Sequence, residues 1–215
     1  MKTIKKLAII LTIGILFFEC VNSKAQQNDE GIQKVIKIGE HVWMTENLNV
    51  DVFQNGDSIP EAKSEEEWKK AGVESKPIWS YYNYYSELGK KYGKLYNWYA
   101  VSDKRGLVPK GWHIPTEAEF QILVTDVNND ANALKAIGQG FGDGVGTNTS
   151  GFSALLAGIS LEGFSYALGQ GSLFWSSTEN SSNKPYGMTL EANNSSIRFL
   201  FLIKNIGGSV RCIKD

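Results

Sequence analysis

The sequence predicts an α+β domain, with short helices in its N-terminal half and an antiparallel β-meander in its C-terminal half. Segments with helix-capping residues lie before residue 140, whereas short apolar runs alternate with turn residues after it. The composition agrees, because 22 glycines and 12% aromatic residues in a chain of 215 suit a domain of strands and loops. A chain of this length can bury one good core.

Residues 1–25 are typical of a secretion signal. Three lysines in MKTIKK precede the uncharged run LAIILTIGILFF, and Ser23 and Ala25 form a small-x-small cleavage site. This run is shorter than the roughly 20 apolar residues that a transmembrane helix needs. Cleavage between Ala25 and Gln26 predicts a secreted protein, extracellular or periplasmic. Lipidation of Cys20 is the alternative, although a glutamate precedes it where lipoprotein sites carry a small residue.

The mature chain is expected to divide into a disordered segment, 26–34, and one domain, 35–215. Removal of residues 1–25 takes away four lysines and one glutamate, which leaves 18 basic and 22 acidic residues. With no basic cluster, this balance gives no electrostatic reason to expect nucleic acid or an anionic membrane as a partner. One remaining cysteine, Cys212, is too few for an intrachain disulfide or a cysteine-based zinc site. The oligomeric state leaves no signal in the sequence.

Local patterns predict the elements of the N-terminal half in turn. Alternating apolar and polar residues over 34–44 predict a hairpin that turns at residues 39–40. Turn-forming residues predict a surface loop over 51–60. A serine cap and a closing glycine predict a helix over 64–72. The aromatic segment that follows predicts a helix over 95–101 with one buried aromatic face.

A capping box predicts the start of the next helix. The Thr116 hydroxyl is expected to accept the amide of the third helical residue, and Glu119 to return to the Thr116 amide. Pro115 keeps the preceding chain extended. A further helix is predicted over 130–137, ended by Gly138.

The sequence pattern changes after residue 140, from helix signals to short strands separated by turns. The loop GFGDGVGTNTSG is rich in glycine, but it lacks the lysine and the spacing of a phosphate-binding loop. The stretch SIRFLFLI is apolar enough to predict a central strand. The strands predicted in this half are 152–160, 172–178, 186–191, 195–203 and 208–214.

Six motifs follow one another along the chain: VWMTENLN (42–49), YGKLYNWYAV (92–101), PKGWHIPTEAEF (109–120), SGFSALLAG (150–158), FWSSTE (174–179) and GGSVRCIKD (207–215). Together they resemble the Fibrobacter succinogenes major paralogous domain, which is found in secreted and surface proteins of bacteria. The Pro-Thr-x-x-Glu helix start and the Val-Arg-Cys strand also resemble the C-type lectin-like superfamily. The resemblance implies a lectin-like fold whose N- and C-terminal strands lie together, with a long irregular loop region above.

The chain departs from this family at one cysteine position. Members commonly carry a cysteine before Pro-x-Gly-Trp-His, paired with that of the last strand, and this chain has Val108 there. Cys212 is therefore expected to act as a small buried apolar residue. Arg211 is expected to pair with an internal carboxylate or carbonyl. The tryptophans of the motifs are expected to fill the core: Trp98, Trp112 and Trp175.

His113 invites a catalytic interpretation, because two glutamates follow it. A catalytic histidine needs a nucleophile or a metal beside it and a group that orients its ring. Glu119 is already used in the capping box, and Trp112 and Pro115 suit the start of a helix. We therefore expect His113 to be part of the scaffold. The formylglycine-generating enzymes also belong to the lectin-like superfamily, but their chemistry needs reactive cysteines. The one cysteine of the mature chain, Cys212, matches a structural position of the family.

Two groups of residues are candidates for ligand binding. Consecutive tyrosines cannot all face inward, so exposed rings that stack on a sugar are expected among Tyr81, Tyr82, Tyr84 and Tyr85. The polar loop 179–187 offers amides for polar contacts, with Asn180 and Asn183 as candidates. No cofactor is expected. The sugar-binding motifs of calcium-dependent lectins do not occur in the sequence. Calcium binding stays open, because loop oxygens of Asp143, Asn180 or Glu191 could be its ligands.

These observations lead to a non-enzymatic binding or interaction module, secreted or exposed on the cell surface. Its expected ligand is a glycan or a surface protein. The alternative is a structural paralogue that packs in an extracellular assembly without a small ligand. An enzyme of unknown type comes third.

Overall fold

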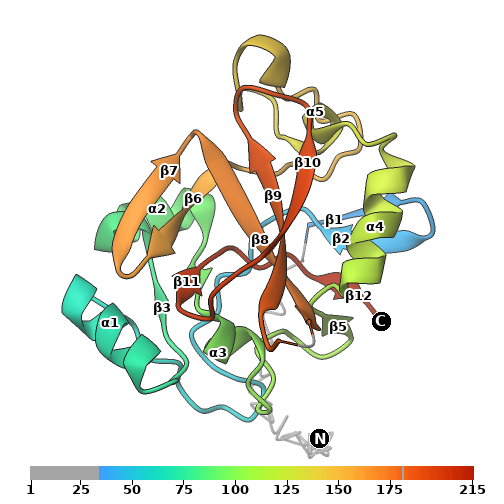
Figure 1. The fold of residues 1–215 in the computed structure, drawn as a ribbon. Helices are drawn as coiled ribbons and strands as arrows, with labels where there is room; N and C mark the ends of the chain where they lie inside the picture. Colours follow the sequence, from blue (N-terminus) through green and yellow to red (C-terminus); the bar gives the residue numbers. More distant parts are fainter. Residues whose placement is uncertain (1–33, 181) are drawn as a thin grey trace, which may run out of the picture. The chain divides into compact units, whose positions relative to one another are not determined.

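The computed structural model describes residues 34–180 and 182–215. The expectations for the secretion signal, for cleavage at Ala25, for lipidation of Cys20 and for disorder over 26–33 lie outside these residues. The described chain is a mixed α+β domain with three sheets and short helices (Figure 1). Within it, no helix has the length and apolar character needed to cross a membrane.

A four-stranded sheet joins the first and last strands, in the order β1-β2-β12-β5. The strands are β1 (Val35–Ile38), β2 (His41–Met44), β5 (Trp112–His113) and β12 (Ile213–Lys214). The hairpin predicted at residues 39–40 is confirmed, and Gly39 makes the turn with φ of 56°. Ile213 pairs with Trp43 on one side and with His113 on the other.

A six-stranded sheet fills the C-terminal half, in the order β10-β9-β8-β6-β11, with β7 paired to β6. The strands are β6 (Ala157–Leu161), β7 (Phe164–Leu168), β8 (Gly171–Glu179), β9 (Pro185–Glu191), β10 (Ile197–Phe201) and β11 (Ile206–Gly207). Strands β8, β9 and β10 form the expected antiparallel meander. The sheet as a whole is mixed, because β6 and β8 pair in parallel where Gly158 meets Ser172.

Among the strand predictions in this half, 208–214 is wrong and 152–160 begins too early, since β6 starts at Ala157. The run 208–214 is not one strand, since only isolated bridges and β12 form within it. Strand β7 was not predicted at all. It belongs to a hairpin with β6, whose two turn residues, Glu162 and Gly163, have φ of 51° and 87°. Such turns usually have Asn or Asp at the first turn position, so the glutamate at this position gave no sequence signal for the turn.

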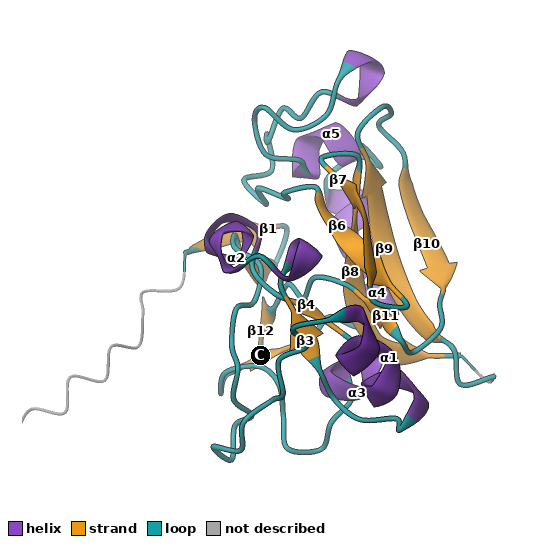
Figure 2. Ribbon diagram, turned by 90° about the vertical axis from the view of Figure 1, so that its left-hand side faces the viewer, coloured by secondary structure: helices purple, strands orange, loops and turns teal. Residues whose placement is uncertain are grey.

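The stretch SIRFLFLI forms an edge strand, which corrects the prediction of a central one. Figure 2 shows β10 on the outer side of the sheet. Leu200 and Phe201 are 44% and 53% exposed, and Ile203 just beyond is 51% exposed. Phe199 gains partial burial by stacking on Tyr186, with ring centroids 5.3 Å apart. An apolar composition therefore does not place a strand within a sheet.

The helices are short, and two of them differ from their predicted extents. They are α1 (Glu65–Val73), α2 (Ser86–Tyr92), α3 (Trp98–Val101), α4 (Glu117–Asp126) and α5 (Ala131–Leu134), with 3-10 turns η1 (Tyr82–Tyr84) and η2 (Gly142–Gly144). The predicted helix 95–101 begins as strand β4 (Leu95–Tyr96), which pairs with β3 (Trp79–Ser80). The predicted helix 130–137 stops at Leu134, because Lys135 is extended and bridges Ala154.

Predicted caps at two helix starts are confirmed. The Ser64 side chain accepts from the Glu67 amide at the start of α1. At α4, the Thr116 hydroxyl accepts from the Glu119 amide, and a Glu119 oxygen accepts from the Thr116 amide at 2.7 Å. These local bonds satisfy amides that the helix itself leaves free.

The core lies on both faces of the six-stranded sheet, because alternate residues of β8 point in opposite directions. Leu173 and Trp175 join one apolar cluster, and Phe174 joins the other. Trp98 is buried against Trp175, with ring centroids 5.6 Å apart, whereas Trp112 is only half-buried against the same cluster.

Cys212 has the environment expected of a small apolar residue. It is fully buried and free, and it shares an apolar cluster with Val108. Burial raises the pKa of its thiol to about 12, so the group is neutral near pH 7.

Candidate ligand-binding site

The four candidate tyrosines do not form an exposed row. Only Tyr85 is mainly exposed, at 65%. The Tyr81 ring packs edge-on against Trp79, with ring centroids 5.1 Å apart, and Tyr82 lies against Gly158. The Tyr84 hydroxyl donates to the carbonyl of Gly163, and burial with nearby glutamates raises its pKa to about 12. Three of the four rings are therefore half-buried by contacts with other segments of the domain.

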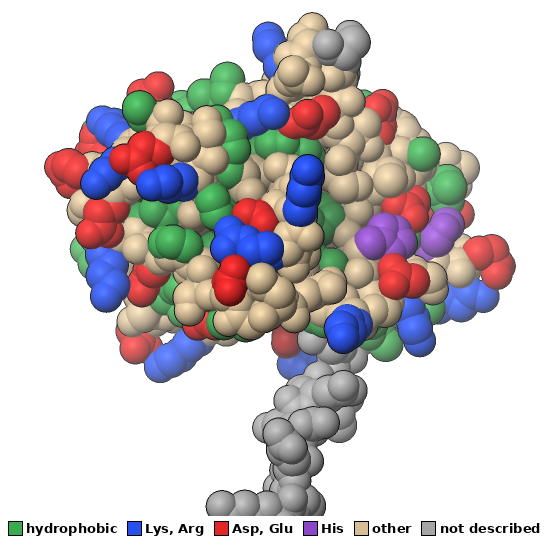
Figure 3. Space-filling view, turned by 90° about the horizontal axis from the view of Figure 1, so that it is seen from below, with side chains coloured by type: hydrophobic (Ala, Val, Ile, Leu, Met, Phe, Trp, Pro, Cys, Tyr) green, Lys and Arg blue, Asp and Glu red, His purple; other side chains and the backbone are tan. Residues whose placement is uncertain are grey.

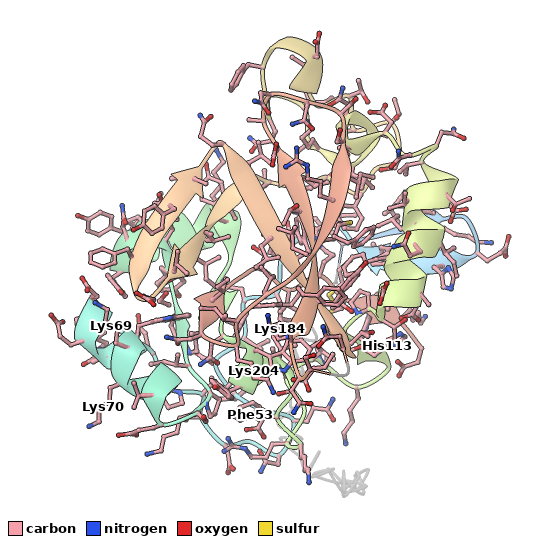
Figure 4. The ribbon with its side chains drawn as sticks, in the orientation of Figure 1. Phe53, Lys69, Lys70, His113, Lys184 and Lys204 are labelled. Atoms are coloured by element: carbon pink, nitrogen blue, oxygen red, sulfur yellow. The ribbon has the colours of Figure 1, made fainter. Side chains whose placement is uncertain are left out.

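The polar loop between β8 and β9 uses its amides to hold itself together. The Asn180 side-chain oxygen accepts from the backbone amides of Ser182 and Lys184, at 2.9 and 3.0 Å. Asn183 is exposed and has φ of 54°, which asparagine tolerates in turns. The nearby Lys204 ammonium pairs with Glu179 at 2.7 Å, below the loop in Figure 4. The two asparagines do not converge on a common ligand position.

His113, labelled in Figure 4, links β5 to α4 and to Asp215. Its Nε2 lies 2.8 Å from a Glu119 oxygen, and its Nδ1 lies 2.8 Å from an Asp215 oxygen. Burial alone lowers the pKa of His113, but the two carboxylates outweigh that effect and raise it. Because both ring nitrogens contact carboxylates, the geometry suits a structural cation rather than a general base. Figure 3 shows histidine and acidic side chains side by side on this face.

A lysine ammonium meets the converging carbonyl oxygens near Asp143 and Glu191. Lys135 is fully buried, and its ammonium donates to the carbonyls of Gly144, Glu191 and Asn194. The Glu191 carboxylate is engaged as well, by Arg198 at 3.1 Å and by the Asn194 amide at 2.7 Å. Residues 34–180 and 182–215 hold no cluster of three His, Cys, Asp or Glu able to bind a metal ion. Asn180, the third calcium candidate, belongs to a different loop.

A cleft of about 360 Å³ lies where segments distant in the sequence meet. We call it the Arg211 cleft. The loop after β2 supplies Asn47 and Asn49, and the last turn of α2 supplies Lys90 and Lys91. Arg211, just before β12, closes its inner wall. None of these residues was proposed from the sequence as a ligand contact.

Arg211 is a buried cation that contacts neutral groups. It is 1% exposed, and its guanidinium donates to the carbonyls of Met44 and Phe152 and twice to the Asn47 side-chain oxygen. The internal carbonyl partners expected for Arg211 are confirmed. Burial lowers its pKa to about 9, and no carboxylate among the described residues forms an ion pair with it. Asn47 is itself held by bonds from its amide to the Tyr92 carbonyl, at 2.9 Å, and to the Ser209 hydroxyl.

Lysines surround the outer part of the cleft. Lys34 pairs with Glu46 at 2.6 Å, and both side chains line the cleft. Lys90 pairs with Glu87 at 2.9 Å, but both side chains are more than 75% exposed, so this pair is weak. The Lys91 ammonium lies 5.0 Å from the centre of the Tyr92 ring.

Four of the six motifs contribute to the Arg211 cleft. VWMTENLN supplies Asn47 and Asn49, YGKLYNWYAV supplies Gly93, SGFSALLAG supplies Ser153, and GGSVRCIKD supplies Arg211. The convergence depends on strand β12 lying beside β2, which no local pattern reveals. The available signal was the pair of asparagines in the first motif, Asn47 and Asn49, because both are polar residues close to a predicted strand.

Comparison with known proteins agrees with the motifs. Neither the curated proteins nor the solved structures provide a match. A family model, the Fibrobacter succinogenes major domain, matches residues 36–214. This match takes in every strand and helix described above except the first residue of β1. The chain belongs to the Fibrobacter succinogenes major domain family.

Proposed function

We propose that this protein is a non-enzymatic binding module that is secreted or exposed on the bacterial surface, and that its ligand binds in the Arg211 cleft. The convergence of four family motifs on this cleft carries the proposal. A pocket of about 360 Å³ falls within the usual range for small-ligand sites. Its amide and hydroxyl groups suit the hydroxyls of a glycan.

The wider assignment has separate support. A lectin-like fold is supported by the pairing of β2 with β12, which brings the first and last strands together. Secretion is supported by the lysines, apolar run and small residues of 1–25. An enzymatic role has less support, because His113 is engaged by Glu119 and Asp215.

A glycan-array screen of purified residues 26–215, with and without calcium, tests the proposal. The double variant Lys90→Gln/Lys91→Gln probes the cleft. Lys104→Gln/Lys110→Gln is the matched control, since these lysines are exposed and lie outside the cleft. Specific binding that only the cleft variant loses would support the proposal. Folded protein that binds no glycan, or binding that both variants retain, would contradict it.

A second function, as a structural or protein-binding unit, is favoured by strand β10. This strand is at the sheet edge and exposes Leu200 and Phe201. Edge strands offer unpaired backbone groups to a further strand. Light scattering of the wild type and of Phe201→Lys tests it: self-association lost in the variant would favour this function, and a monomer in both would exclude homotypic assembly through β10.

A further inference from the structure

The buried charge of Arg211 has no anion among its contacts. A guanidinium has five N–H donors, and four bonds to neutral oxygens leave one Nη2 hydrogen free. Removing a cation from water is costly, and buried arginines are usually paired with a carboxylate or phosphate. Here the neutral oxygens orient the guanidinium without neutralising it. The charge is therefore held in place at the inner wall of the Arg211 cleft.

The rest of the cleft adds to this positive charge. Lys34, Lys90 and Lys91 line it, and the single acidic group of the lining, Glu46, is bound to Lys34. The whole chain has a formal net charge of −1, so the cleft is more positively charged than the molecule as a whole. A concave surface lined by one sign of charge concentrates ions of the opposite sign.

The polar neighbours limit what kind of anion fits. Asn49 is exposed at the cleft, and no hydrogen bond from its side chain to the described protein is seen. Such an amide can donate to and accept from ligand hydroxyls. A ligand with one carboxylate and several hydroxyls satisfies both parts of the cleft. A bare multivalent anion uses only the cations.

We propose that the Arg211 cleft binds acidic saccharides. The carboxylate of the sugar acid lies towards Arg211 and the lysines, and the sugar hydroxyls lie towards Asn49. This proposal rests on the function proposed above and names its ligand class. The remaining Nη2 hydrogen can donate one charge-assisted hydrogen bond to a carboxylate oxygen. The lysines attract the anion and respond to salt. Asn47 orients the Arg211 guanidinium, and the guanidinium in turn orients the carboxylate.

Titration of residues 26–215 with glucuronate, followed by amide NMR shifts and calorimetry, tests the proposal. Glucose is the matched neutral probe, because it differs by a hydroxymethyl group in place of the carboxylate. Acetate and inorganic phosphate separate the carboxylate alone and a general anion from the sugar acid. We expect glucuronate to shift the amides of 45–49 and 89–93, and to bind at least about tenfold more tightly than glucose, acetate or phosphate.

Variants decide whether the cleft is responsible. Lys90→Gln/Lys91→Gln should weaken glucuronate binding about tenfold, and Lys104→Gln/Lys110→Gln should leave it unchanged. Equal binding of glucose and glucuronate, sensitive to the cleft variant, would overturn the acidic-ligand proposal and leave the proposed function standing. Equal or tighter binding of phosphate would also overturn it. Folded protein that binds neither these probes nor any arrayed glycan would overturn both proposals.

Discussion

Replacing Lys135 with methionine removes a buried ammonium while keeping most of the volume of the side chain. The wild-type ammonium donates to three backbone carbonyls, those of Gly144, Glu191 and Asn194. It thereby ties the glycine-rich loop to the connection between β9 and β10. Hydrogen bonds to a charged group contribute about 1.5–3 kcal/mol each. The ammonium's own cost of burial offsets part of that gain, so we expect a net loss of about 3 kcal/mol.

Urea unfolding at neutral pH measures this loss as a lower midpoint with an unchanged slope. Lys110→Met is the control, because Lys110 is exposed, and it should change stability by no more than about 0.5 kcal/mol. Hydrogen exchange provides a local readout: amides of residues 140–147 should exchange faster in Lys135→Met. A variant as stable as the control, with unchanged exchange in this loop, would refute the reasoning.

Three further predictions follow from single contacts. The pKa of His113 is raised in the folded state, so the stability from its ion pairs is fully present below pH 6.5 and is lost as pH rises through the folded pKa. Because the side chain is half-exposed, we expect this contribution to be less than about 1 kcal/mol. Unfolding midpoints of the wild type should therefore decrease as the pH rises from about pH 5 to about pH 9, and His113→Gln should abolish that dependence on pH. A Cβ at residue 144 would lie 2.1 Å from the Ala192 carbonyl oxygen, so Gly144→Ala should lower stability by about 2 kcal/mol in urea unfolding, and a neutral result would contradict the close approach. The Cys212 thiol, buried and with a pKa of about 12, should react with a thiol reagent only on unfolding, and rapid labelling of native protein would disprove its burial.

Local patterns in the sequence predicted local structure well. The hairpin at residues 39–40 and the capping box of Thr116 and Glu119 depend on contacts within a few residues, and both are confirmed. The helix predicted over 130–137 failed because Lys135 is drawn to carbonyls contributed by distant segments. A lysine in an alanine-rich run is normally a solvated helical residue, so nothing nearby in the sequence indicates its burial.

In the candidate site too, local contacts could be predicted from the sequence, whereas contacts between distant segments could not. Sequence reasoning expected an internal carbonyl partner for Arg211, and the bonds to Met44 and Phe152 confirm it. It did not predict the cleft, because the cleft exists only when the segments around residues 47, 90, 153 and 211 meet. The tyrosines were chosen for their chemistry, and their burial depends on packing against other segments, such as Gly158.

The position of β12 has a consequence for how this chain reaches its native state. Trp43 and Ile213 pair across almost the whole described sequence, and β12 lies between β2 and β5. A ribosome therefore delivers the first strand of this sheet long before the strand that completes it. Contacts so far apart in sequence slow folding, because a long loop must close before they form. The nascent chain consequently keeps this sheet open until residues 213–214 have been synthesised.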